Sequence, residues 1–250
     1  MSQRIDRCIV IPARYGSRRL PGKVLLDLGG KPIVQHVIER ALEVVDKDNV
    51  LLATDHEAIA RVGEPFGIRI VMTDRAIPNG TLRCIRALES VEIEPQYVIN
   101  LQADEPFVLP RDLERLFLQL ERGDEIVTLA MEPTYVEDYH SAHHVKVVCD
   151  KSGRAMYFSR APIPWGITED ALAEVRIHIG IYGFRYTVMK SLSLGATPSL
   201  AQREQLEQLS WLWVGKTIRV LDTSGLYIGI DTQKDYERAL EMLNARGSKD

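Results

Sequence analysis

Short apolar runs alternate with amphipathic segments along the first half of the chain. The apolar runs have the length of buried strands and cover residues 8–12, 50–54, 68–72 and 97–101. Apolar residues then recur every three or four positions, which predicts helices at residues 33–45, 56–63, 81–91 and from 110 onward. This order predicts an α/β fold with a doubly wound, mostly parallel sheet. Because ligands bind such sheets beyond the carboxyl ends of the strands, the loops that follow the strands are the ones to examine.

The second half has a different pattern, with strand-like runs that follow one another closely. These runs cover residues 126–131, 145–149, 154–157, 177–186 and 216–221. Residues 150–153 form a predicted hairpin turn, and helices are predicted at 202–213 and 233–244. No linker rich in Ser, Gly or Pro interrupts the chain. We therefore expect a single domain over residues 1–250 with an inserted antiparallel lobe at about 130–200.

Composition narrows the function without identifying it. The 250 residues carry a net charge of -4, which disfavours a general nucleic-acid binder, because such a protein needs a basic surface. No apolar stretch approaches the roughly 18–20 residues that cross a bilayer, and the N-terminus has no signal-peptide core. Three widely spaced cysteines form no zinc-binding pattern, and Cys8 and Cys149 lie in apolar runs as expected of core residues. We expect a reduced, cytoplasmic, soluble protein without nucleic-acid or membrane partners.

The loop after the first strand is rich in cations and glycines. Arg14, Arg18, Arg19 and Lys23 lie within ten residues, with Gly16 and Gly22 between them. Glycines let backbone N–H groups approach an anion, and clustered cations repel one another unless an anion neutralises them. A solvated basic turn is the alternative. The place of the loop, at the carboxyl end of a strand, favours a site for a triphosphate, although the loop matches neither the Walker A nor the GxGxxG pattern.

Two acidic segments are candidate metal ligands. Asp104 and Glu105 follow the fourth strand, where a carboxylate can hold Mg²⁺ or an acidic pair can begin a helix. Asp231 precedes the last predicted helix, and alone it is better explained as the helix cap. Two separated carboxylates can share a magnesium ion that also binds substrate phosphates, so Asp104 and Asp231 together predict a metal site.

A polar group in the second half is a candidate pocket for an acid. Arg160 can bind a carboxylate through two hydrogen bonds. His178 shares one face of an alternating strand with Tyr182, although a lone histidine in a strand is more often structural. We interpret four other histidines, His36, His56 and the pair His143–His144, as surface or capping residues.

The order and spacing of these segments resemble the 3-deoxy-manno-octulosonate cytidylyltransferase (CMP-Kdo synthetase) family over nearly the whole chain. The segments are IPARYGSRRLPGK at 11–23, GKPI at 30–33, ATD at 53–55, NLQADEP at 100–106, VKVV at 145–148, YFSR at 157–160, HIGIY at 178–182, LEQL at 206–209 and GIDT at 229–232. The resemblance implies a nucleotide-diphospho-sugar transferase-like fold. It also implies a Mg²⁺-dependent enzyme that couples CTP to a sugar acid (Kdo) and releases pyrophosphate, and a homodimer formed through the inserted lobe.

The resemblance also assigns roles to residues. It implies that Lys23, Arg14, Asp104 and Asp231 are catalytic, and that Asp104 and Asp231 hold the magnesium. The nucleotide-binding residues that it implies are Pro12, Ala13, Arg14, Tyr15, Gly16, Ser17, Lys23, Asn79, Gly80, Thr81, Arg83 and Gln102. The acceptor-binding residues that it implies are Arg160, His178, Tyr182, Glu207 and Gln208.

The chain departs from the family pattern at several positions. Ile77, Asn79 and Leu82 replace the usual His, Ser and acidic residue of one loop, and Ala103 replaces a glycine beside Asp104. Ala201 and Ser210 replace a Glu and an Arg near the LEQL segment. These departures leave two alternatives open: CMP transfer to a different small acid, such as a modified sugar acid or a phosphonate, and a CTP-binding protein without catalysis.

Overall fold

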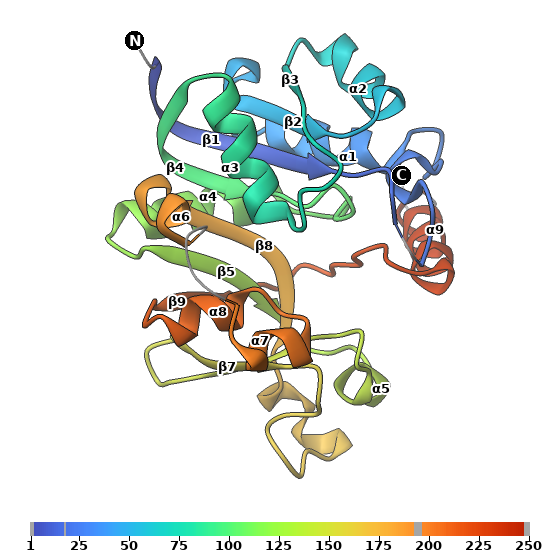
Figure 1. The fold of residues 1–250 in the computed structure, drawn as a ribbon. Helices are drawn as coiled ribbons and strands as arrows, with labels where there is room; N and C mark the ends of the chain where they lie inside the picture. The colour runs from blue at the N-terminus through green and yellow to red at the C-terminus, as the bar shows by residue number, and fades with distance from the viewer. Residues whose placement is uncertain (1–2, 18, 193–196, 248–250) are drawn as a thin grey trace. The chain divides into compact units, whose positions relative to one another are not determined.

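The computed structural model describes residues 3–17, 19–192 and 197–247 (Figure 1). Contacts divide the chain into two compact units. Unit 1 comprises Met1–Glu114 and Leu226–Asp250, and unit 2 comprises Arg115–Gly225. The expectation of a single domain with a lobe at about 130–200 stays a prediction. Arg18, one of the four predicted loop cations, lies outside the described residues.

Unit 1 contains the predicted parallel sheet. Its strands are β1 (Gln3–Ala13), β2 (Val50–Thr54), β3 (Arg69–Met72) and β4 (Ile93–Asn100), in the order β3-β2-β1-β4. All neighbouring pairs in this order are parallel, with Ala13 opposite Thr54 and Thr54 opposite Met72. The α/β fold with a mostly parallel sheet is thereby confirmed. The register brings the carboxyl ends of the strands to one edge, where the predicted site residues follow.

The helices of unit 1 begin near the predicted residues. They are α1 (Ile33–Leu42), α2 (Glu57–Gly63), α3 (Gly80–Ser90), the start of α4 (Pro110–Glu121) and α9 (Gln233–Gly247). α1 ends three residues before the predicted Val45. His56 Nδ1 accepts a hydrogen bond from the Ala58 N–H at the start of α2, so the predicted capping role of His56 is confirmed.

The C-terminal segment completes unit 1. Residues of α9 and of the strand-like segment before it pack on a cluster around Leu28 and Ile33, which also includes Phe107, Ile230 and Ala239. Figure 1 shows α9 beside the loop that follows β1, although these segments lie about two hundred residues apart in sequence. This packing brings the segment that carries Asp231 back to the first half of the chain.

Unit 2 combines antiparallel and parallel pairing. Its strands are β5 (Ile126–Met131), β6 (Lys146–Cys149), β7 (Ala155–Ser159), β8 (Ile177–Arg185) and β9 (Ile218–Asp222). β8 is antiparallel to β5 and β6, and β6 is antiparallel to β7. β5 and β9 are parallel. The strands therefore occur where the sequence predicts them, except that Tyr186 begins a helix instead of ending a strand.

The helices of unit 2 correct the sequence prediction. The single helix predicted at 202–213 is wrong, because α7 (Ser199–Glu204) and α8 (Gln208–Trp213) are separate. Gln205 ends α7 with a left-handed φ of 53°, a conformation that cannot continue a right-handed helix. The short helices α5 (Val136–His140) and α6 (Tyr186–Leu192) have no counterpart in the prediction.

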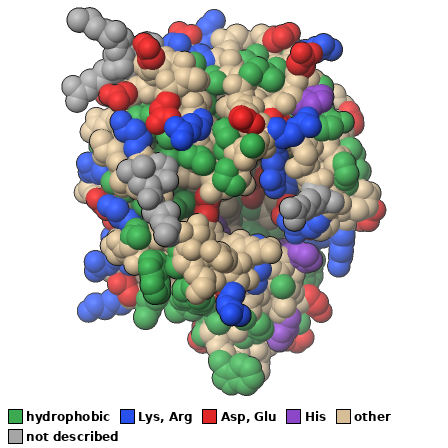
Figure 2. Space-filling view, viewed as in Figure 1, with side chains coloured by type: hydrophobic (Ala, Val, Ile, Leu, Met, Phe, Trp, Pro, Cys, Tyr) green, Lys and Arg blue, Asp and Glu red, His purple; other side chains and the backbone are tan. Residues whose placement is uncertain are grey.

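The surface carries both charges, and two of the three cysteines are buried. On the face in Figure 2, acidic and basic side chains are interspersed. Cys8 and Cys84 are buried and Cys149 is half-buried, so Cys149 is not the core residue that its apolar run predicts. In the described ranges, no helix combines the length and apolar character that crossing a membrane requires.

Candidate functional site

The basic loop after β1 folds back on itself. The Tyr15 carbonyl accepts hydrogen bonds from the N–H groups of Ser17 and Gly22, at 3.1 Å and 3.3 Å. Gly22 has a φ of 64°, which an L side chain adopts only at a cost. Lys23 follows it at the start of the short helix η1 (Lys23–Leu25). The turn at Gly22 thus sets the position of Lys23. Arg14 and Gly16 of the same loop are exposed.

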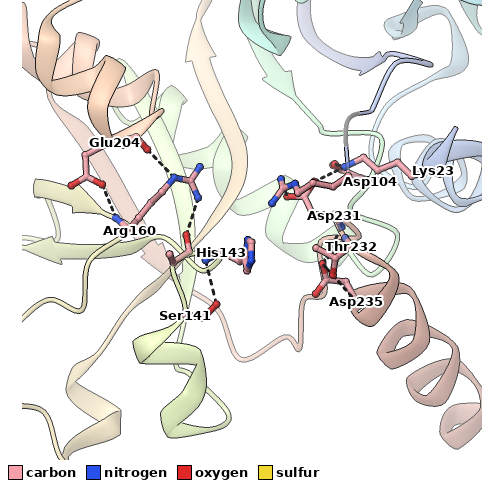
Figure 3. Close-up of polar contacts among 11 residues, drawn as sticks. Lys23, Asp104, Ser141, His143, Arg160, Glu204, Asp231, Thr232 and Asp235 are labelled. Atoms are coloured by element: carbon pink, nitrogen blue, oxygen red, sulfur yellow. Dashed lines mark hydrogen bonds and ion pairs between the residues drawn. The ribbon is translucent and has the colours of Figure 1, made fainter. Parts of the chain in front are cut away.

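Lys23 lies between the two carboxylates that the sequence predicts as metal ligands. Its Nζ contacts Asp104 Oδ2 and lies 2.7 Å from Asp231 Oδ1, as Figure 3 shows. Arg19 Nη2 lies 2.7 Å from Asp231 Oδ2. Burial opposes the charged form of Lys23, but Asp104 and Asp231 outweigh burial and raise its pKa. Burial likewise opposes ionisation of Asp231, and Lys23 and Arg19 reverse that effect and lower its pKa. Both shifts favour the charged forms of Lys23 and Asp231.

Two distant segments supply the carboxylates. Asp104 follows β4, and Asp231 lies in the segment that leads into α9. The N–H of Ile230 donates to the Asp104 carbonyl at 3.0 Å, which ties the two segments together. A Cβ at Gly229 would lie 2.9 Å from Glu105 Oε1. The backbone at Gly229 therefore lies so close to Glu105 that a larger residue would displace the Glu105 side chain.

Asp231 is not the cap of α9, which settles one alternative from the sequence. Thr232 takes that role: its Oγ1 accepts a hydrogen bond from the Asp235 N–H at 3.3 Å, and Asp235 Oδ2 accepts from the Thr232 N–H at 2.8 Å. This reciprocal arrangement is a capping box. The Asp231 side chain is consequently available to Lys23 and Arg19.

Glu105 is a buried carboxyl group next to this cluster. Its Oε2 is buried and has no hydrogen-bond partner in the described part of the chain. Burial, with the negative charges of Asp104 and Asp231, raises the pKa of Glu105 well above its usual range. The alternative of an Asp104–Glu105 helix cap is not realised, because Asp104 pairs with Lys23 and α4 begins at Pro110.

The residues predicted to contact the nucleotide lie at the same edge of the sheet. Asn79 caps α3 by accepting from the Leu82 N–H at 2.8 Å, so this departure from the family serine keeps a capping side chain. Gln102 Nε2 donates to Asn100 Oδ1 at 2.8 Å, and Asn100 Nδ2 donates to Thr81 Oγ1 at 3.3 Å. A Cβ at Gly80 would lie 2.9 Å from Gln102 Nε2, so Gly80 leaves room for that amide.

Asp55 is a site residue for which the sequence analysis gives no role. Its Oδ1 accepts a hydrogen bond from the Tyr15 N–H at 2.9 Å, and its Oδ2 lies 3.7 Å from Arg83 Nη2. The Tyr15 ring stacks on His56 with centroids 4.0 Å apart. Asp55 follows β2 at the carboxyl edge of the sheet, so the rule that pointed to Asp104 also applies to Asp55. It links the basic loop to the Arg83 position.

The carboxylate pair fits a magnesium ion. No group of three or more His, Cys, Asp or Glu side chains arranged for a metal occurs among the residues with described placement. Asp104 and Asp231 nevertheless converge on one cation, the Lys23 ammonium. Mg²⁺ commonly takes one or two protein carboxylates and completes its shell with water and substrate phosphates. The donor set therefore suits Mg²⁺ together with a polyphosphate.

The predicted acceptor residues all lie in unit 2. Arg160 is anchored at both ends: its N–H donates to Glu204 Oε2 at 2.9 Å, and its Nε donates to the Glu204 carbonyl at 2.8 Å (Figure 3). Its Nη1 donates to the Ala142 carbonyl at 2.9 Å, and Nη2 has no partner in the described ranges. The guanidinium is held in place with N–H groups left for an anion.

His178 and Tyr182 lie on β8 against one aromatic cluster. Their ring centroids are 5.2 Å apart, and Phe158 packs edge-on against His178 at 5.1 Å. Burial lowers the pKa of His178 to about 3, so its ring is neutral at physiological pH. The buried Tyr182 hydroxyl has no partner among the described residues, and burial with the charge of Glu207 raises its pKa.

Glu207 and Gln208 lie where α8 begins. Glu207 is the residue before the helix, and the side chain of Gln208 is buried. Ala201, one of the departures, is buried in α7. Unit 2 thus contains all five predicted acceptor residues. Their role toward an acceptor stays a prediction.

Lys146 and Glu204 fix the loops around Arg160 by hydrogen bonds. Neither residue has a role predicted from the sequence. Lys146 is fully buried, and its Nζ donates to the carbonyls of Ser141, His144 and Arg160 at 2.7, 2.6 and 2.8 Å. Burial and the charge of Arg160 lower its pKa to about 8. The Glu204 carboxylate also accepts from Ser159 Oγ at 2.6 Å. A lysine within the apolar run 145–149 is a signal of such a role, because an ammonium buried in a strand needs hydrogen-bond acceptors.

Comparisons with known proteins identify the family of the chain. A family model described as cytidylyltransferase matches residues 8–218. The chain is 40% identical over 237 residues to 3-deoxy-manno-octulosonate cytidylyltransferase of Anaeromyxobacter sp. (strain Fw109-5), covering 95% of this chain and 96% of the relative. It is 39% identical to the enzyme of the same name from Porphyromonas gingivalis (strain ATCC BAA-308 / W83), covering 95% and 96%.

Solved structures give the same result. CMP:2-keto-3-deoxy-manno-octonic acid synthetase complexed with CTP matches with a TM-score of 0.86 and 36% identity, over 96% of this chain and 99% of that chain. A putative glucose-1-phosphate thymidylyltransferase from Bacillus anthracis, 16% identical, shares the fold with a TM-score of 0.66 over 94% of each chain. The chain therefore belongs to the 3-deoxy-manno-octulosonate cytidylyltransferase family of CTP-dependent nucleotidyltransferases.

Proposed function

We propose that the protein transfers the CMP group of CTP to 3-deoxy-manno-octulosonate (Kdo), with release of pyrophosphate. The observation that carries the proposal is the Lys23 ammonium between Asp104 and Asp231 at the carboxyl edge of the parallel sheet. The relatives named for this activity match nearly the whole chain. An oxygen of the acceptor attacks the α-phosphorus of CTP in line, and pyrophosphate leaves.

Catalysis in this reaction consists of positioning and charge neutralisation. Lys23 and Arg14 offset the charge of the phosphates, and the backbone around Gly16 and Ser17 approaches them closely. No side chain of the site needs to become a covalent nucleophile. Asp104 and Asp231 would hold Mg²⁺, which when bound supplies positive charge at the reacting phosphate.

The nucleotide and the acceptor contact different residues in this proposal. The base and ribose lie near Gln102 and the Asn79–Thr81 loop, with Pro12, Ala13, Tyr15 and Arg83 at the same edge of the sheet. Arg160 binds the carboxylate of the sugar acid, because its guanidinium keeps N–H groups that have no partner among the residues with described placement. His178, Tyr182, Glu207 and Gln208 approach the rest of the acceptor.

We also propose a cytoplasmic homodimer, with the inserted lobe as the contact between copies. The three cysteines are free thiols, as in a reducing compartment. Light scattering after size-exclusion chromatography gives the mass directly. A monomer at micromolar concentration would contradict the dimer without touching the proposed reaction.

Pyrophosphate release tests the reaction. We expect CTP with Kdo and Mg²⁺ to support turnover, and each of the other nucleoside triphosphates, or an omitted acceptor, to support little. Asp104→Asn should reduce turnover more than about a hundredfold, because it weakens a metal carboxylate and leaves Lys23 with a single acidic partner. Activity close to that of the unaltered enzyme would contradict the metal assignment.

The same assay decides between acceptors. Other sugar acids and small phosphonates are tested beside Kdo at equal concentration. Preference for one of them would retain CMP transfer and replace the acceptor. CTP binding without pyrophosphate release for any acceptor would favour a binding protein without catalysis.

A further inference from the structure

A buried threonine contacts His178, one of the predicted acceptor residues. Thr128 is fully buried on β5, at the point where the pairing of β5 with β8 shifts. Thr128 pairs with Tyr182, but the next residue of β5, Leu129, pairs with Ile179. Gly180 and Ile181 are thus left over in a bulge of β8, and bulges re-aim side chains near functional sites.

The Thr128 hydroxyl has three polar neighbours. Its Oγ1 lies 2.7 Å from the Ile181 carbonyl and 3.2 Å from the Ile179 carbonyl, both at the bulge of β8. Its third neighbour is His178 Nε2, at 3.0 Å. A carbonyl oxygen only accepts, and a hydroxyl has one proton to donate. The Thr128 proton therefore goes to the carbonyls, and toward His178 the hydroxyl accepts.

The ring nitrogen that faces Thr128 must then carry hydrogen. A neutral imidazole has one N–H and one lone pair, so a proton on Nε2 leaves the lone pair on Nδ1. His178 is half-buried, and Nδ1 has no hydrogen-bond partner among the described residues. Nδ1 is accordingly the free acceptor of a ring fixed by Phe158 and Tyr182.

We propose that Thr128 is a positioning residue that fixes His178 as the Nε2–H tautomer, so that Nδ1 accepts a hydrogen bond from a hydroxyl of the acceptor. This inference rests on the proposed function for the identity of the acceptor. It divides recognition between two side chains. Arg160 takes the carboxylate, and His178 selects acceptors that present a hydroxyl donor, since a lone pair repels a carboxylate oxygen.

The tautomer is measurable without turnover. Long-range ¹⁵N–¹H spectra of the unliganded protein with ¹⁵N-labelled histidine distinguish Nε2–H from Nδ1–H and from the doubly protonated ring. The signal of His178 is identified by its loss in His178→Gln. At pH 7 we expect the Nε2–H pattern. The Nδ1–H pattern or an imidazolium would overturn the proposal, whatever the enzyme does with Kdo.

Substitution of Thr128 tests the link to the acceptor. Thr128→Val has nearly the same volume and no hydroxyl, and Thr128→Ser keeps the hydroxyl. We expect Thr128→Val to replace the pure Nε2–H signature with ¹⁵N shifts averaged over both tautomers, because nothing then fixes the ring proton. It should also raise the KM for Kdo roughly tenfold, the scale of one oriented hydrogen bond. The KM for CTP should stay unchanged, and Thr128→Ser should restore both the signature and the KM for Kdo.

His178→Gln is the matched partner of these variants. The Gln amide N–H can still donate to Thr128, but no acceptor remains in the place of Nδ1. We expect it to raise the KM for Kdo by the same factor as Thr128→Val. Equal rises in the KM for CTP and Kdo, or a KM for Kdo that neither variant changes, would overturn the proposal. If the unaltered enzyme shows no turnover with Kdo, the proposed function fails, and the spectra still decide the role of Thr128.

Discussion

Asp231 and Thr232 are adjacent residues with separate tasks. The Asp231 carboxylate pairs with Lys23 and Arg19, whereas Thr232 exchanges hydrogen bonds with Asp235 at the start of α9. Because the cap is made by the neighbour, Asp231 contributes its charge to the site instead of to the helix. Sequence reasoning alone favoured the cap for Asp231, because both residues are good capping types and the carboxylate partner lies in a distant segment.

Paired substitutions separate these tasks. Thr232→Ala should cost about 1 kcal/mol in the free energy of unfolding, the usual effect of losing a cap, and keep most of the turnover. Asp231→Asn should lower turnover more than about a hundredfold and change stability less than Thr232→Ala does. Urea unfolding and pyrophosphate release, measured on both variants, check this. Equal loss of activity in the two variants would contradict the separation of the two tasks.

At the scale of elements, α7 and α8 are two helices because of one residue. Gln205 adopts φ 53° and stops α7, and the chain then begins α8 after Glu207. The strands were predictable because apolar runs of five or six residues, as in β2 and β5, have the length of strands and are too short for most helices. The break was not, because the left-handed position usually carries Gly or Asn, and glutamine gives no such signal.

The break at Gln205 is testable by substitution. Gly adopts the left-handed conformation without penalty, whereas a β-branched residue is strained there. We expect Gln205→Ile to be less stable than Gln205→Gly by about 1–2 kcal/mol, the cost of a left-handed L residue. Since the adjacent Glu204 anchors Arg160, Gln205→Ile should also raise the KM for Kdo more than that for CTP. Equal stability of the two variants in urea would contradict the role of this conformation.

At the scale of the whole molecule, the site of unit 1 is assembled from segments far apart in sequence. Asp104 could be predicted, because it follows a strand of a parallel sheet. The pairing of Asp104 with Asp231 could not be derived from spacing, because it depends on α9 packing on the cluster around Leu28 and Ile33. The chemistry of two carboxylates made that pairing a hypothesis, and the family resemblance supported it. Buried supports such as Lys146 escaped both kinds of reasoning, because their importance lies in carbonyl partners that only the folded chain brings together.

The same burial that neutralises His178 makes the stability of the molecule depend on pH. The folded-state pKa is about 3, against 6.5 for an unperturbed histidine. As pH falls below 6.5, the unfolded chain takes up a proton at His178 that the folded chain does not, so stability is lost on acidification. Between pH 7.5 and 5 this loss amounts to about 2 kcal/mol relative to a side chain that does not titrate.

His178→Gln provides the reference side chain that does not titrate. All three tryptophans, Trp165, Trp211 and Trp213, lie in unit 2, so tryptophan fluorescence in urea follows the unit that contains His178. The difference in unfolding free energy between the unaltered protein and His178→Gln should move in favour of the variant by about 2 kcal/mol over this range. A difference that is independent of pH would mean that His178 accepts its proton in the folded state, as an exposed histidine does.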